Sequence, residues 1–205
     1  MGLQIDTELC YQNIHKIVKK AKSLNNFVRI DMEDSPYTSS TIEIFTRLKK
    51  EFQNVGTVLQ AYMRRSIDDL NALIKIKTNL RICKGIYDEA RSIAFKDPFI
   101  VNQNFALMIE KGLQSNCYIG IATHDEKVVW EGLKCIDSLQ LDRSQYEFQM
   151  LLGVDEELKK IILDEGHKLR IYVPYGEEWY AYSMRRLKEN PKIAVYIMKA
   201  FFGLK

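Results

Sequence analysis

Cysteine and histidine are scarce in this sequence, and their spacing fits no common metal site. The chain has three histidines without a His-x-x-x-His pair, and no two of its cysteines form a Cys-x-x-Cys pair. The four cysteines are Cys10, Cys83, Cys117 and Cys135. Zinc sites and small disulfide frameworks depend on such close spacings. We therefore expect neither a metal site nor a disulfide scaffold.

Long apolar runs and an excess of one charge are also missing. No apolar run reaches the roughly 18 residues that a membrane span needs, and no secretory signal opens the chain. We therefore expect a cytoplasmic protein. The net charge is +3, from 30 basic and 27 acidic residues. Because no basic block interleaved with aromatic residues is present, we expect no nucleic-acid partner.

Several common catalytic and phosphate-binding motifs are absent as well. The sequence contains no Gly-x-Gly-x-x-Gly, no P-loop and no Gly-x-Ser-x-Gly, which disfavours the nucleotide-binding and hydrolase classes that depend on them. No linker rich in proline, glycine or serine divides the 205 residues. A single domain with a sizeable core is therefore the expected organisation.

What the sequence does contain is an alternation of short β-forming runs with segments of helical period. The predicted strands lie in residues 27–31, 55–62, 79–85, 118–125, 146–151 and 169–176. Repeated βα units imply a parallel sheet with right-handed crossovers, either closed as a barrel or open. In the first helical segment one buried face is predicted from the spacing of Ile14, Ile17, Val18 and Ala21.

Three helix starts are predicted from capping signals. Ser40 with Glu43 fits a capping box. Asp97 before Pro98 and Asn190 before Pro191 each place a capping side chain ahead of a proline at the first helical position. These signals support the alternation of strands and helices.

Polar residues gather near the carboxyl ends of the predicted strands. They are Asp31, Gln60, Arg81, Lys84, Thr123, His124, Gln149 and Tyr172. One such residue is usually a cap or a turn residue, but six successive strand ends need another explanation, since buried polar groups require partners. In a (βα)8 barrel the strand ends converge on one mouth, where such enzymes place their chemistry. The pattern favours a barrel over an open sheet.

Two adjacent arginines stand out in "WYAYSMRRLKENP", residues 179–191. On a helix, residues three or four positions apart are neighbours. Tyr182 lies three and four positions before Arg185 and Arg186, and Glu189 lies four and three positions after them. Two guanidinium groups so placed can meet one carboxylate from two directions, since each can bind it bidentately. The alternative is a surface ion pair of about 0–1 kcal/mol.

Six blocks in a fixed order carry a resemblance to a known family. They are "RIDMEDSPYT", "LQAYMRR", "RICKGIYDEA", "ATHDE", "YEFQMLLGV" and "RIYVPYGEEWYAYSMRRLKENP". With these blocks the chain closely resembles the proline dehydrogenase family, in particular its small monofunctional bacterial type. The resemblance implies an α/β fold of the (βα)8 TIM-barrel type. It also implies FAD-dependent oxidation of L-proline to Δ1-pyrroline-5-carboxylate, with electrons passed to a membrane quinone.

The resemblance also implies roles for residues around the substrate. Arg185 and Arg186 would grip the proline carboxylate, and Glu189 and Asp31 would hold these arginines by ion pairing. The residues that would wall the proline ring against the flavin are Tyr87, Leu151, Tyr172 and Tyr182.

A second set would bind the cofactor. Gln60 and Arg81 would hydrogen-bond the isoalloxazine edge, with Arg81 close to the atom that receives hydride. The rest of the FAD would be lined by Met32, Cys83, Lys84, Gly85, Thr123 and His124.

This sequence departs from the family pattern before Asp31. Family members carry N-terminal helices and two further strands, the second ending in a lysine that contacts substrate and flavin. We therefore expect residues 1–205 to be a barrel domain with only about strands three to eight. Two hypotheses stay open: an FAD enzyme whose missing part comes from a separate chain or a different start codon, and a non-catalytic fragment that needs that part to bind FAD.

The last residues allow two interpretations. Their apolar stripe consists of Ile193, Ile197, Ala200 and Phe201. We favour packing on the barrel; the other interpretation is a peripheral contact with the inner face of the membrane, near the quinone.

Overall fold

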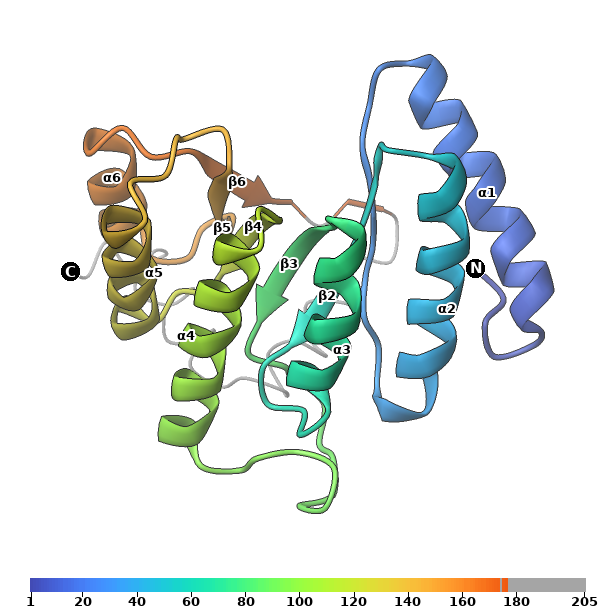
Figure 1. The fold of residues 1–205 in the computed structure, drawn as a ribbon, viewed down its shortest axis with the longest axis horizontal. Helices are drawn as coiled ribbons and strands as arrows, with labels where there is room; N and C mark the ends of the chain where they lie inside the picture. Colours follow the sequence, from blue (N-terminus) through green and yellow to red (C-terminus); the bar gives the residue numbers. More distant parts are fainter. Residues whose placement is uncertain (174, 177–205) are drawn as a thin grey trace. The chain divides into compact units, whose positions relative to one another are not determined.

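Strands and helices alternate along the part of the chain that this computed structural model describes, residues 1–173 and 175–176 (Figure 1). The strands are β1 (Val28–Ile30), β2 (Val55–Gln60), β3 (Asn79–Cys83), β4 (Tyr118–Ala122), β5 (Tyr146–Leu151) and β6 (Leu169–Tyr172). Every predicted run contains one of them. The predicted α/β class is therefore confirmed.

Helices follow the strands as βα units require. The α-helices are α1 (Thr7–Ser23), α2 (Thr38–Glu51), α3 (Ser66–Leu73), α4 (Pro98–Gln114), α5 (Glu126–Ser138) and α6 (Glu156–Asp164). Two short 3-10 helices are η1 (Ser35–Tyr37) and η2 (Ile74–Ile76). The sheet order is β1-β2-β3-β4-β5-β6, and the pairs β1·β2, β2·β3 and β5·β6 are parallel.

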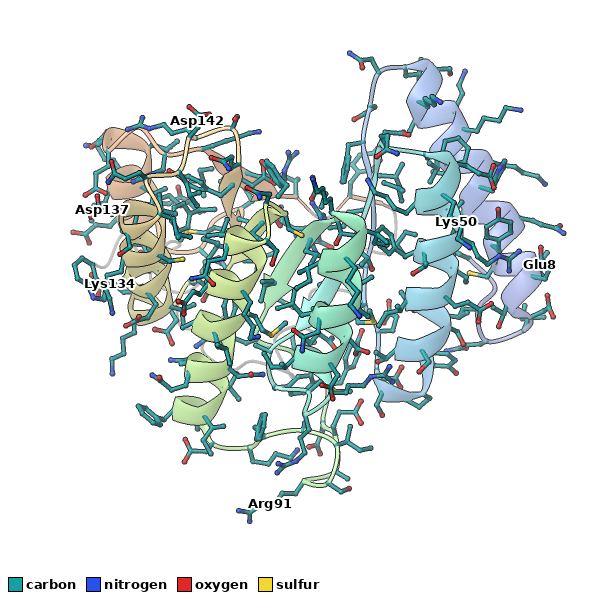
Figure 2. The ribbon with its side chains drawn as sticks, in the orientation of Figure 1. Glu8, Lys50, Arg91, Lys134, Asp137 and Asp142 are labelled. Atoms are coloured by element: carbon teal, nitrogen blue, oxygen red, sulfur yellow. The ribbon has the colours of Figure 1, made fainter. Side chains whose placement is uncertain are left out.

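The chain divides into two compact units, Met1–Ile119 and Gly120–Lys205. In the first, α2 and α3 pack on β2 and α4 packs on β3; in the second, α6 packs on β6. Charged side chains such as Glu8 on α1 and Lys134 on α5 are exposed (Figure 2), and Glu8 pairs with Arg47 of α2 at 2.8 Å. The expectation of one barrel domain over residues 1–205 stays a prediction.

The first helix buries part of the predicted face: Ile14 and Val18 are buried, and Ala21 is half-buried. Its buried residues are Cys10, Ile14 and Val18, whereas Ile17 is 44% exposed. These three residues recur at intervals of four, and this stripe leaves Ile17 on its flank. The prediction was right for Ile14 and Val18 and wrong for Ile17.

Of the three predicted helix starts, one is confirmed, one is wrong, and the one at Asn190 and Pro191 lies outside the described residues. Asp97 caps α4, accepting from the Phe99 amide at 2.8 Å, with Pro98 at the first helical position. Ser40 lies inside α2, which continues directly from η1 and begins at Thr38. The turn that begins at Ser35 starts the helical path earlier than the capping box predicts.

Within the described residues, no helix has both the length and the apolar composition needed to cross a bilayer.

Candidate functional site

Arg81, in the middle of β3, and Asp31, directly after β1, form an ion pair. Arg81 Nη1 donates to both carboxylate oxygens of Asp31, at 3.1 and 3.2 Å. Strand register explains the contact: Val58 of β2 pairs with Arg81, and Ile30 of β1 pairs with Thr57. The arginine therefore reaches across β2. Its side chain is 17% exposed, so a permanent cation is held just below the surface at the strand ends.

A second arginine crosses β2 nearer its start. Arg29 of β1 donates to Asn79 Oδ1 of β3 at 2.5 Å and to the carbonyl of Thr57 at 3.0 Å. Gly56 lies on β2, between β1 and β3. A Cβ at this position would stand 2.9 Å from Arg29 Nη1 and 2.5 Å from the Asn79 carbonyl oxygen, too close for any side chain. The crossing of β2 by Arg29 was not predicted from the sequence, although a glycine inside a strand signals such a close approach.

Gln60 ends β2 with its side chain buried. The residue is 4% exposed, and its backbone carbonyl accepts from Ser66 Oγ at 2.5 Å. Its side-chain amide hydrogen-bonds none of the residues that the structure describes. Because buried amides normally have partners, an amide of this kind at a strand end is a candidate ligand-binding group.

The loop that follows β3 is fixed against Tyr62. The Tyr62 amide donates to the carbonyl of Lys84 at 2.8 Å, and Gly85 adopts a φ of +102° with the Tyr62 ring against its Cα. Burial, reinforced by the nearby Glu89 carboxylate, raises the pKa of the Tyr62 phenol. Tyr62 is therefore a neutral packing residue at physiological pH.

Three other predicted residues lie close to these strand ends. Met32 is buried directly after Asp31, and its amide donates to the Asp31 carboxylate at 3.1 Å. Cys83 is the last residue of β3 and pairs with Gln60. The Tyr87 hydroxyl donates to the Glu33 carboxylate. The first unit thus brings together the predicted residues from Asp31 to Tyr87.

In the second unit, predicted residues meet at the ends of β4, β5 and β6. Leu151 of β5 pairs with Tyr172 of β6. His124 follows β4, and its Nε2 lies 2.9 Å from the Leu151 amide nitrogen. Thr123 is buried, and its Oγ1 accepts from the Asp125 amide at 3.0 Å. These contacts place the substrate-wall and cofactor-lining candidates of this unit side by side.

Gln149, one of the polar strand-end residues, contacts the buried carboxylate of Glu147. Its Nε2 donates to Glu147 Oε1 at 2.7 Å, and Arg170 of β6 donates to the two oxygens of the same carboxylate at 2.7 and 3.0 Å. The Glu147 side chain is only 1% exposed. A carboxylate can only accept, so Nε2 of Gln149 faces it and the amide oxygen of Gln149 faces away.

Replacing Arg170 by methionine is expected to destabilise the chain by about 2 kcal/mol, because the buried Glu147 carboxylate loses two charge-assisted hydrogen bonds. Lys168→Met is the matched control. The Lys168 ammonium lies 3.8 Å from that carboxylate with its side chain 53% exposed, and its loss is expected to cost about 0.5 kcal/mol. Urea unfolding measures both, and equal losses would contradict the assignment.

The remaining predicted site residues cannot be placed. The predicted clamp and one residue of the substrate wall lie outside the described residues; these are Tyr182, Arg185, Arg186 and Glu189. The apolar stripe near the end of the chain lies outside them too. Their roles stay predictions. Across the described ranges, no group of three or more His, Cys, Asp or Glu side chains is arranged to hold a metal ion.

Comparison with known proteins gives the family. The sequence profile described as "Proline dehydrogenase" matches residues 2–89 and 100–197. The chain belongs to the proline dehydrogenase family. It is 37% identical over 199 residues to Proline dehydrogenase 1 of Bacillus subtilis (strain 168), covering 97% of this chain and 66% of that protein. With the proline dehydrogenase of Deinococcus radiodurans the identity is 36% over 194 residues, covering 94% and 63%. The chain thus spans less than two thirds of the length of these relatives.

Solved structures share the fold of this chain. Proline utilization A (PutA) from Bdellovibrio bacteriovorus, inactivated by N-propargylglycine, matches with a TM-score of 0.85 and 27% identity over 92% of this chain and 22% of that one. PutA from Corynebacterium freiburgense matches with a TM-score of 0.77 and 22% identity over 98% and 24%. The predicted fold class, a partial (βα)8 TIM-barrel type with six parallel strands, is confirmed for this family member.

Proposed function

We propose that this chain binds FAD, oxidises L-proline to Δ1-pyrroline-5-carboxylate and passes the electrons to a membrane quinone. Family membership supports this assignment. The observation that carries it is the ion pair of Arg81 with Asp31 near the unused buried amide of Gln60, toward the carboxyl ends of the parallel strands β1, β2 and β3. This is the end of a βα sheet at which ligands bind.

The residues of the first unit fit a flavin. A flavin ring edge carries both hydrogen-bond donors and acceptors, and the Gln60 amide can serve either kind. In our proposal Gln60 and Arg81 hold the ring edge, and Met32, Cys83, Lys84 and Gly85 line the rest within this unit. Thr123 and His124, which belong to the second unit, are also proposed as cofactor-lining residues. When bound, FAD supplies the two-electron acceptor.

Each protein group then has a limited task. The permanent charge of Arg81 stabilises negative charge that develops beside it, and the Asp31 carboxylate keeps that guanidinium in place. The proposed clamp of Arg185 and Arg186, with Glu189, holds the substrate carboxylate. The apolar and aromatic wall excludes water from the ring; it consists of Tyr87, Leu151, Tyr172 and Tyr182. No side chain needs to act as a nucleophile.

The visible absorption spectrum tests the proposal. The purified chain is incubated with FAD, desalted and measured before and after anaerobic addition of L-proline, with heat-denatured chain as the control for carried-over FAD. We expect a retained flavin band that bleaches with proline, since proline is the electron donor. A chain that stays colourless, or a band that proline leaves unchanged, would contradict the proposal and favour the non-catalytic fragment.

A further inference from the structure

The amide of Leu151 points away from β6. The amides of Phe148 and Leu152 donate to carbonyl oxygens of Lys168 and Tyr172 on the β6 side, at 2.8 and 3.1 Å. Successive N–H groups along a strand point to opposite edges, so the Leu151 amide faces the edge on which β4 lies. β4 ends at Ala122, so the Leu151 amide needs a partner other than a backbone carbonyl of that strand.

The imidazole of His124 satisfies it. His124 Nε2 lies 2.9 Å from the Leu151 nitrogen. The backbone amide can only donate, so Nε2 must accept. The ring is therefore neutral and carries its proton on Nδ1. This geometry sets the tautomer, because Nε2 cannot carry a proton while it accepts.

The surroundings of His124 favour the same neutral form. Burial lowers the pKa of His124, the positive charge of Lys159 on α6 lowers it further, and the Asp155 carboxylate opposes them. The Lys159 side chain is 4% exposed and donates to Glu156 at 2.7 Å. Next to His124, Asp125 caps α5 by accepting from the Lys127 amide at 3.0 Å, which restrains the loop that carries the imidazole.

We propose that His124 is a positioning residue, whose neutral imidazole replaces the missing strand partner of Leu151 and fixes the end of β5. A role for this hydrogen bond in placing Leu151 against the substrate rests on the proposed function. The positioning of β5 by His124 does not depend on that function. The family resemblance also implies that His124 lines the cofactor. Because Nε2 is occupied by the Leu151 amide, only the Nδ1 side of the ring can take that role.

The first test is the tautomer and its titration. Nitrogen-15 NMR of the labelled chain distinguishes the ring nitrogens, and His15→Gln and His167→Gln variants assign the three histidine signals. His124 is expected to show the Nδ1–H tautomer and to titrate below the ordinary histidine pKa of about 6.5. An Nε2–H tautomer, or titration at or above the ordinary value, would overturn the proposal.

The direction of the pH effect follows from this lowered pKa. The folded chain binds the His124 proton less readily than the unfolded chain, so the stability from this hydrogen bond is complete above about pH 6.5. It is lost as the pH falls through the lowered pKa of the folded chain. Below that pH both Nε2 and the Leu151 amide are donors, and they cannot bond.

The second test uses two variants and amide hydrogen exchange. Glutamine can place its side-chain oxygen near the position of Nε2, whereas phenylalanine fills the site without an acceptor. His124→Phe is expected to speed exchange at Leu151 about tenfold, while His124→Gln keeps it near the parental rate. The amide of Phe148, bonded to β6, is the internal reference.

Equal exchange in the two variants, or a Phe148 amide that changes as much as Leu151, would overturn the positioning role. Neither test requires bound FAD. A failure of the flavin experiment therefore counts against the proposed function alone, and a wrong tautomer counts against the positioning role alone.

Discussion

Replacing Arg81 by methionine is expected to slow the reduction of bound flavin by L-proline by about 10² to 10³-fold, the usual cost of removing one preorganised group that stabilises developing charge. The Arg81 guanidinium is mostly buried and held by both oxygens of Asp31. Its charge is therefore fixed before the reaction and needs no reorganisation. Anaerobic stopped-flow absorbance, normalised to bound flavin, measures the rate.

Arg29→Met is the matched control for Arg81→Met. Arg29 crosses the same strand nearer its start and donates to Asn79, and it is not part of the proposed site. Its loss is expected to lower stability while leaving the reduction rate per bound flavin within about threefold of the parental rate. Similar slowing in both variants would show that the effect comes from the sheet and not from charge at the flavin.

The strands could be predicted from the sequence because each is a short β-forming run bounded by turn or helix signals. The polar strand ends could be found in the same way. Their pairing could not: the contact of Arg81 with Asp31 depends on the register of three strands, and residues 50 apart carry no local signal of it. The family resemblance assigned Asp31 to other arginines, which lie outside the described residues.

Glu147 shows a second limit of sequence reasoning. In "YEFQML" the alternation places Glu147 and Gln149 opposite Tyr146 and Phe148, which predicts a polar face. The structure buries both faces of β5. The polar face can be buried because Arg170 of the next strand and Gln149 together satisfy the Glu147 carboxylate. Periodicity separates the two faces of a strand but does not tell whether the polar one meets solvent.

Replacing Gly85 by alanine is expected to destabilise the chain by about 4 kcal/mol and to abolish the flavin band. A Cβ there would stand 2.1 Å from Cδ1 of Tyr62, and the φ of +102° is unfavourable for alanine. The ring cannot move away cheaply, because Tyr62 is 8% exposed and its backbone bonds to Lys84 and Phe95, both at 2.8 Å. Urea unfolding measures the stability, and absorbance after desalting with FAD measures the binding.

Gly153→Ala separates crowding from backbone strain. Gly153 also has a positive φ, +75°, but no atom lies within 4 Å of the position that its Cβ would take. Its replacement is expected to cost only about 1 kcal/mol, the penalty of the left-handed conformation alone. If Gly85→Ala lowered the free energy of unfolding no more than Gly153→Ala does, the Tyr62 ring would be able to move away from the new methyl group. The loop after β3 would then not be held as tightly as a preorganised flavin site requires.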